Sequence, residues 1–233
     1  MPTKAELKKI DGLVQHFRDN EDLVRSFLRG ILGVLAESRS LAPHIHSIIS
    51  RIKDPDHLRD KLIRKLNQAK AKKKEFRVTA RNLLTEITDL AGVRILHLHT
   101  WQFENINRVL LDIFEEHQYG LLEGPFARTW DDEYRAFFRQ LGVKTQESPT
   151  LYTSVHYVIE SVSRRKVTCE IQVRTLMEEV WGEVDHLINY PHPIQSVACS
   201  EQIKVLARAT STATRLVDSI FATHRDLQRR TTH

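Results

Sequence analysis

A change of hydrophobic period near the middle of the C-terminal half dominates the pattern of this chain. In residues 167–175 apolar and polar side chains alternate, which predicts a strand whose polar face carries Glu170, Gln172 and Arg174. Apolar residues then recur at helical spacing up to residue 190. A carboxylate, an amide and a guanidinium in a row can hold a metal, a hydroxyl and a phosphate. The pattern therefore predicts a site where this strand passes into a helix.

Two earlier stretches have the pattern of strands that could lie beside it. Residues 152–159 alternate, with Tyr152, Ser154 and His156 on one face. In residues 89–96 an aspartate precedes a short apolar run that contains one arginine, and a charge in such surroundings is costly unless it is paired. Periodicity alone is equally consistent with three unrelated strands.

The remaining apolar pattern is mostly helical. Helices are expected at residues 4–36 with a break and an N-cap at Asp19-Asn20, at 102–118, at 131–141, and over about 25 residues from Ile203 to Leu227 after a break at Pro191 and Pro193. Packing or self-association would explain the long last helix. Residues 119–125 read as an edge strand and turn, and residues 142–150 read as a loop. A strand followed by a helix begins an α/β unit, so a sheet flanked by helices is expected.

The segment after residue 43 carries several basic residues. Its structural interpretation is a charged amphipathic helix with a kink near Pro55. Its functional interpretation is an anion-binding segment, because arginine and lysine recur through it at Arg51, Lys53 and Lys61. Both interpretations are consistent with the pattern.

Composition restricts the class of protein. The 233 residues are 41% hydrophobic and 28% charged, with a net charge of +5, which favours a polyanionic partner. No run approaches the roughly 18 apolar residues that cross a bilayer, and the N-terminus has no apolar signal core, so we expect a cytoplasmic protein without a membrane partner. Neither a G-x-x-x-x-G-K-[ST] nor a G-x-G-x-x-G motif occurs.

The motifs resemble the synthetase domain of the RelA/SpoT alarmone family. The matching blocks follow in the family's order: Asp89-x-x-Gly92-x-Arg94-Ile95, Tyr152-x-Ser154-x-His156, Glu170-Ile171-Gln172-Val173-Arg174-Thr175 and Trp181-x-Glu183-x-x-His186. The resemblance implies a nucleotidyltransferase-like α/β fold, with a mixed β-sheet of about five strands flanked by helices over residues 45–190. Residues 1–44 and 191–233 would be helical extensions. No His-Asp dipeptide occurs, so the hydrolase activity found in the family is not expected.

The resemblance also implies a reaction, the transfer of the β,γ-pyrophosphoryl group of ATP to the ribose 3′-hydroxyl of GDP or GTP. Asp89 and Glu170 would hold Mg²⁺, and Glu170 would accept the proton of the hydroxyl. The expected ATP-binding residues are Arg51, Lys53, Lys61 and Arg94. Tyr152 would stack on the acceptor base, and the residues expected to orient acceptor phosphates or support the carboxylates are His156, Gln172 and Arg174.

Two departures from the family pattern leave the acceptor open. His57 stands near the place of a small hydroxyl residue, and Leu151 replaces a glycine in a segment that is usually rich in lysine. The 3′ end of tRNA is therefore an alternative acceptor. A non-catalytic module that binds nucleotide or RNA is the alternative of another class.

Overall fold

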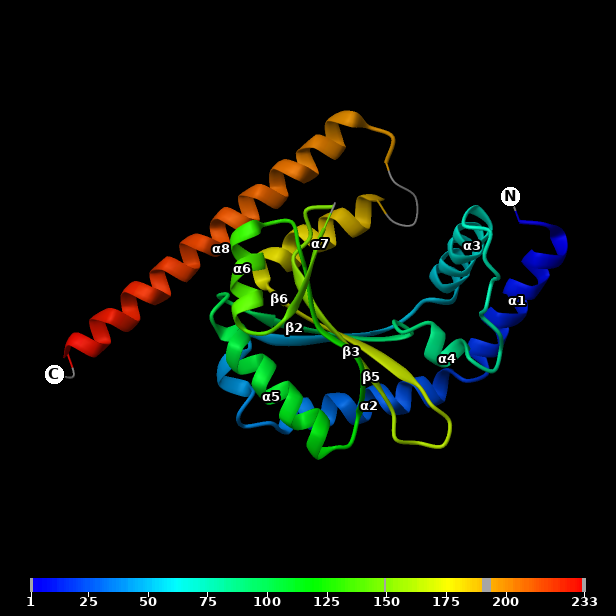
Figure 1. Ribbon diagram of the computed structural model, residues 1–233, viewed down its shortest axis with the longest axis horizontal. Coiled ribbons are helices and arrows are strands. Elements are labelled where there is room, and N and C mark those ends of the chain that lie inside the picture. Colours follow the sequence, from blue (N-terminus) through cyan, green and yellow to red (C-terminus); the bar gives the residue numbers. More distant parts are fainter. Residues whose placement is uncertain (1, 149, 190–193, 232–233) are drawn as a thin grey trace.

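A mixed six-stranded sheet forms the centre of the molecule (Figure 1). The computed structural model describes residues 2–148, 150–189 and 194–231. The strands are β1 (Ser47–Ile52), β2 (Ala91–His97), β3 (Gly120–Thr129), β4 (Lys144–Glu147), β5 (Ser154–Glu160) and β6 (Thr168–Thr175). Their order is β1-β2-β6-β5-β3-β4; β2/β6 and β3/β4 are parallel pairs, and the other neighbours are antiparallel.

The expected α/β architecture is confirmed, and the sheet has one strand more than the five expected. Strand β4 lies inside the segment that reads as a loop, because its sequence KTQE has no apolar alternation and it pairs on one side only. Strand β3 was expected at an edge, but it lies between β5 and β4. The helical interpretation of the segment after residue 43 is wrong over β1, where β-branched isoleucines favour a strand.

Helices cover the sheet on both faces. They are α1 (Lys4–Arg18), α2 (Glu21–Glu37), α3 (Pro55–Ala71), α4 (Leu83–Glu86), α5 (Gln102–Glu116), α6 (Asp132–Gln140), α7 (Leu176–Asn189) and α8 (Val197–Thr231), with a 3₁₀ turn η1 (Ala42–His44). Helices α2 and α5 lie against one face, and α7 lies against the other with α8 outside it (Figure 1). The break between α1 and α2 is confirmed, but the side chain of Asn20 donates to the His16 carbonyl and does not cap α2.

The main hydrophobic core lies between the sheet and the helices α1, α2, α3 and α5, with Phe17, Leu62, Phe103 and Tyr157 fully enclosed. Cys169 belongs to this core as a free thiol whose pKa is raised by burial. No helix of the described ranges is long and apolar enough to cross a membrane. The expected break at Pro191 and Pro193 lies outside the described residues.

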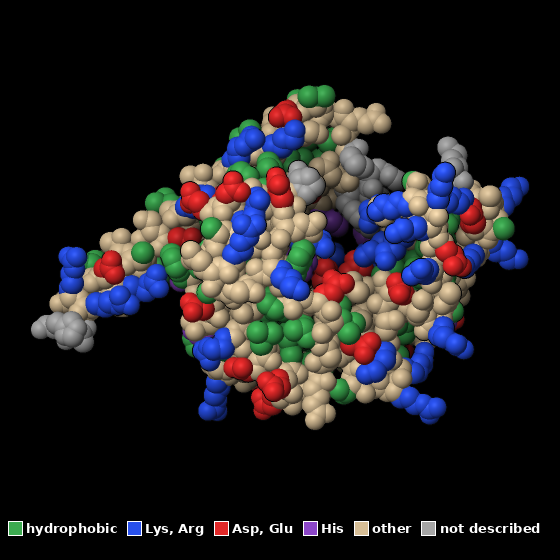
Figure 2. All heavy atoms as spheres, viewed as in Figure 1, with side chains coloured by type: hydrophobic (Ala, Val, Ile, Leu, Met, Phe, Trp, Pro, Cys, Tyr) green, Lys and Arg blue, Asp and Glu red, His purple; other side chains and the backbone are tan. Residues whose placement is uncertain are grey.

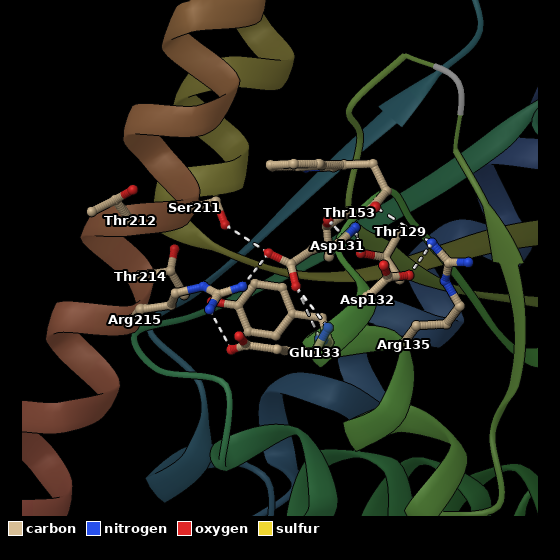
Figure 3. Close-up of polar contacts among 12 residues, drawn as sticks. Thr129, Asp131, Asp132, Glu133, Arg135, Thr153, Ser211, Thr212, Thr214 and Arg215 are labelled. Carbon is tan, nitrogen blue, oxygen red and sulfur yellow. Dashed lines mark hydrogen bonds and ion pairs between the residues drawn. The ribbon is translucent and has the colours of Figure 1, made fainter.

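A second, smaller cluster joins α8 to α7. Its buried members are Trp181, Ile203 and Ala207, and Leu151 and Tyr152 pack against them. Further along α8, polar contacts hold this helix against the N-terminus of α6 (Figure 3). Asp131, which caps α6, accepts a hydrogen bond from Ser211 at 3.3 Å and forms an ion pair with Arg215. The contacts of α8 continue to Asp218, which accepts a hydrogen bond from the Thr100 backbone, and to Phe221, whose ring packs against His99, but the apolar residues Leu216, Ile220 and Leu227 are exposed. The register predicts the helix correctly but predicts its buried face wrongly, because that face continues from Ala207 through Thr210, Ser211 and Thr214.

Candidate active site

A cavity of about 190 Å³ opens between β1, β2, β6 and α7. Its lining contains Ile49, Ser50, Arg51, Gly92, Val93, Arg94, Glu170, Gln172, Glu183 and His186. In the space-filling view a hollow at the centre of the molecule has acidic and histidine side chains within it and lysine and arginine side chains along one border (Figure 2). The register explains the grouping, because parallel pairing places Gly92 opposite Glu170 and Arg94 opposite Gln172. Four of the predicted site residues therefore share one cavity.

Asp89 precedes β2 and is held by two lysines from separate elements. Lys53, which follows β1, lies 2.9 Å from Oδ2, and Lys61 of α3 lies 2.7 Å from Oδ1. Burial favours the neutral acid, but the charges of Lys61 and Lys53 outweigh it and lower the pKa of Asp89 to about 2. Asp89 is therefore an anion at neutral pH, enclosed by cations.

Glu170 lies on β6 with both carboxylate oxygens engaged. Oε1 lies 3.1 Å from Nδ1 of His156, and Oε2 accepts a hydrogen bond from Nε2 of Gln172 at 3.0 Å. Burial raises the pKa of Glu170 and so does the charge of Asp89, but the contacts with His156 and Gln172 outweigh them, so the net shift is downward. Because the charge of Asp89 acts on Glu170, the two carboxylates belong to one electrostatic site.

Two arginines on adjacent strands are bound to acidic residues of α7. Arg94 Nη1 lies 2.9 Å from Glu179 Oε1 and also contacts Glu183. Arg174 pairs with the second oxygen of Glu179. Arg94 is thus the paired buried cation that its apolar surroundings require. Glu179 was not predicted from the sequence, because it lies outside the motifs that match the family. The one signal for it was its position one helical turn before Glu183, on the same side of the predicted helix.

Tyr152 stands at the edge of this constellation rather than in the cavity lining. Its hydroxyl donates to Gln172 Oε1 at 3.2 Å, and its ring centroid lies 6.0 Å from that of Trp181 and 5.8 Å from the Arg174 guanidinium. The preceding residue, Leu151, adopts a left-handed backbone with φ of 58°. That is the position where the family has a glycine, which adopts this conformation without steric cost.

The donor set fits a divalent cation that arrives with a nucleotide. Asp89 and Glu170 are both ionised and partly accessible, with 14% and 19% of their side chains exposed. Mg²⁺ in proteins is commonly held by one or two carboxylates together with substrate phosphates and water. Across the described ranges, no group of three or more His, Cys, Asp or Glu residues is arranged to hold a metal. Further ligands would therefore have to come from phosphate oxygens and water.

Comparison with known proteins agrees with this geometry. The family model described as the region found in RelA/SpoT proteins matches residues 50–195. A comparison with curated proteins gives no match. Among solved structures, a GTP pyrophosphokinase family protein from Streptococcus pneumoniae is 16% identical with a TM-score of 0.61, covering 92% of this chain and 95% of that chain. Small alarmone synthetase 2 from Bacillus subtilis is 21% identical with a TM-score of 0.59, covering 90% and 99%.

A third relative has been solved with nucleotides. Small alarmone synthetase 1 from Bacillus subtilis bound to its product pppGpp is 20% identical, with a TM-score of 0.53 and coverage of 92% of this chain and 97% of that chain. The same protein bound to AMPCPP is 17% identical, with a TM-score of 0.55 and coverage of 91% and 98%. These similarities are to the fold, and the family match covers more than half of the sequence. The chain belongs to the RelA/SpoT family and has the fold of the small alarmone synthetases.

Proposed function

We propose that this chain is a pyrophosphokinase that transfers the β,γ-pyrophosphoryl group of ATP to the ribose 3′-hydroxyl of GDP or GTP, releasing AMP and forming an alarmone of the (p)ppGpp type. The observation that carries the proposal is Glu170: an ionised carboxylate in a cavity wall, held by His156 and Gln172 and coupled to Asp89. The product and the nucleotide analogue bound by small alarmone synthetase 1 support the same substrate class.

The basic residues would bind the donor. Arg51 and Arg94 line the cavity and offer guanidinium planes to a purine or edges to phosphate. Lys53 and Lys61 contact Asp89, whose charge acts on Glu170 in the cavity wall, and the side chain of Lys61 is the more exposed of the two. Phosphoryl-group transfer depends on positioning and on charge neutralisation, and preorganised cations supply both.

Glu170 would take the proton from the acceptor hydroxyl as the oxygen attacks the β-phosphorus and the bond to the α-phosphate oxygen breaks, leaving AMP. His156 and Gln172 hold the carboxylate in one orientation, which keeps the proton acceptor in place. Tyr152 would stack on the acceptor base, with Trp181 packed beside its ring as a support. Arg174, which is buried at 5% exposure, would support the acceptor site through its contact with the Tyr152 ring.

Asp89 and Glu170 would hold Mg²⁺, which neutralises charge on the phosphates of the donor. Both carboxylates are available as anions at neutral pH, since both pKa values are lowered. Asp89 would exchange part of its contact with the two lysines for the cation, which frees these ammonium groups for the triphosphate.

A tRNA 3′ end is the second candidate acceptor. It presents the same ribose hydroxyl, and the net charge of +5 favours a polyanionic partner. Labelled ATP offered with GDP, GTP and deacylated tRNA in separate reactions distinguishes the acceptors, with Glu170→Gln as the inactive control. The proposal predicts labelled GDP or GTP product and AMP; labelled tRNA alone would reassign the acceptor. Absence of AMP with every acceptor would leave a non-catalytic binding module.

A further inference from the structure

One carboxylate, that of Glu179, lies between guanidinium groups of two different strands. Its Oε1 lies 2.9 Å from Nη1 of Arg94 on β2, and its Oε2 contacts Arg174 on β6. Glu179 and Arg174 are both buried, at 8% and 5% exposure. Neither the family motifs nor the reaction proposed above assigns Glu179 a role.

The carboxylate of Glu179 offsets the repulsion between the two arginines. β2 and β6 are adjacent parallel strands, so their arginines place two positive charges on the same side of the sheet. Like charges in a poorly solvated site repel each other strongly. Glu179 compensates both with one charge. Glu183 also contacts Arg94, but 45% of its side chain is exposed, against 10% for Glu179, so solvent weakens its contribution.

The two arginines lead to different halves of the site. Arg94 lines the cavity proposed for the donor. Arg174 lies over the ring of Tyr152, the residue proposed to stack on the acceptor base. Arg174 has little freedom, because a Cβ at Gly182 would lie 2.6 Å from its Nη1, so the helix backbone lies directly against it. The backbone at Gly182 and the carboxylate of Glu179 thus confine the Arg174 guanidinium together, and the same carboxylate contacts Arg94.

We propose that Glu179 is a positioning residue that holds Arg94 for the donor nucleotide and Arg174, with Tyr152, for the acceptor nucleotide, and so couples the two half-sites. The inference rests on the proposed function and deepens it. Glu179 acts through the arginines and touches neither substrate. Loss of its charge leaves both guanidiniums uncompensated, so both substrates are affected together.

The test compares three carboxylate-to-amide variants on α7. Glu179→Gln keeps the size of the side chain and removes the charge; it should raise both the KM for the acceptor and the dissociation constant for a non-hydrolysable ATP analogue by about tenfold or more. Glu183 forms an ion pair with Arg94 and acts on Arg174 only at longer range, so Glu183→Gln should weaken donor binding with little effect on the acceptor. Asp185→Asn, whose carboxylate accepts a hydrogen bond from Asn189, should match wild type. Glu179→Asp should recover part of the loss.

The outcomes separate this inference from the proposed function. If wild type transfers pyrophosphate and Glu179→Gln has unchanged constants, or loses donor affinity alone as Glu183→Gln does, the coupling role is refuted. A variant that only melts earlier, with unchanged constants below its melting temperature, also refutes it. If wild type transfers nothing, the proposed function fails, and titrations with the ATP analogue and with GDP still test Glu179. A wild type that binds neither nucleotide overturns both.

Discussion

Replacement of Glu178 by glutamine should remove the contribution of this one carboxyl to the pH dependence of folding. Glu178 lies in the first turn of α7 with 3% exposure, and its Oε1 has no hydrogen-bond partner in the part of the chain that the structure describes. Burial raises the pKa of this carboxyl from 4.5 to about 8, against the lowering effects of the Thr153 backbone and the charge of Arg174. The fold therefore keeps Glu178 protonated at neutral pH.

The sign follows from the proton balance. Between pH 4.5 and about 8 the folded chain retains a proton that the unfolded chain has lost, so the free energy of unfolding falls as pH rises through this window. Each pH unit corresponds to about 1.4 kcal/mol, so the whole window corresponds to roughly 4–5 kcal/mol at most. Glutamine is neutral throughout and keeps an acceptor for the Thr153 backbone. Its advantage over wild type should thus be smallest near pH 4.5 and should level off above pH 8.

Urea unfolding at pH 5, 6, 7, 8 and 9 measures this difference directly. The difference in unfolding free energy between Glu178→Gln and wild type cancels the contribution of every other titrating group. Glu104→Gln is the matched control, because Glu104 is exposed on α5, and it should run parallel to wild type. A constant difference between Glu178→Gln and wild type across this range would refute the account of a buried, protonated carboxyl.

Three further changes test other parts of the account. Glu170→Gln should abolish transfer while circular dichroism and melting remain close to wild type, and wild-type turnover would remove its assigned role. Gly124→Ala should destabilise the fold by more than about 2 kcal/mol and lower activity, because the φ of Gly124 is +98° and a Cβ there would lie 2.3 Å from the His156 carbonyl oxygen. Gly33→Ala is the matched control: a Cβ at this position in α2 would meet nothing within 4 Å, so the variant should be stabilised by roughly 1 kcal/mol. Denaturant unfolding measures both differences. Asp89→Asn leaves two lysines uncompensated and should lower the free energy of unfolding by roughly 3 kcal/mol at pH 7. The difference from wild type should shrink as the pH falls from 3.8 toward 2, because wild type loses the same charge in this range. An equal loss of stability at every pH would contradict the ion-pair explanation.

Much of the site follows from local sequence. The period of two places Glu170 and Gln172 on one face of β6 independently of tertiary contacts, and the resemblance to the family implies that the strands bearing the motifs contribute to one site. The paired state of Arg94 was expected because a charge among apolar residues needs a partner. The identity of that partner was not, because Glu179 reaches Arg94 only through the packing of α7 across two strands, a long-range arrangement without a local signal.

The errors in the fold have similar physical causes. Strand β1 ends next to a charged helix, so its short run of isoleucines was absorbed into a helical pattern. Strand β4 is short and polar, and its pairing with β3 decides its conformation. In helix α8 the face that packs against the molecule carries Thr210, Ser211 and Thr214, so Leu216 and Ile220 are exposed although their spacing resembles that of buried residues. In each case tertiary context decides.

The most direct test of the central claim follows both labelled phosphates of the donor through the reaction. ATP labelled at the β- and γ-phosphates is incubated with purified chain, Mg²⁺ and GDP or GTP, and nucleotides are separated with time. The account predicts that both labels move together to the acceptor with one AMP formed per product, and that Glu170→Gln forms neither. Formation of ADP with transfer of the γ-label alone, or no AMP with either acceptor, would contradict it.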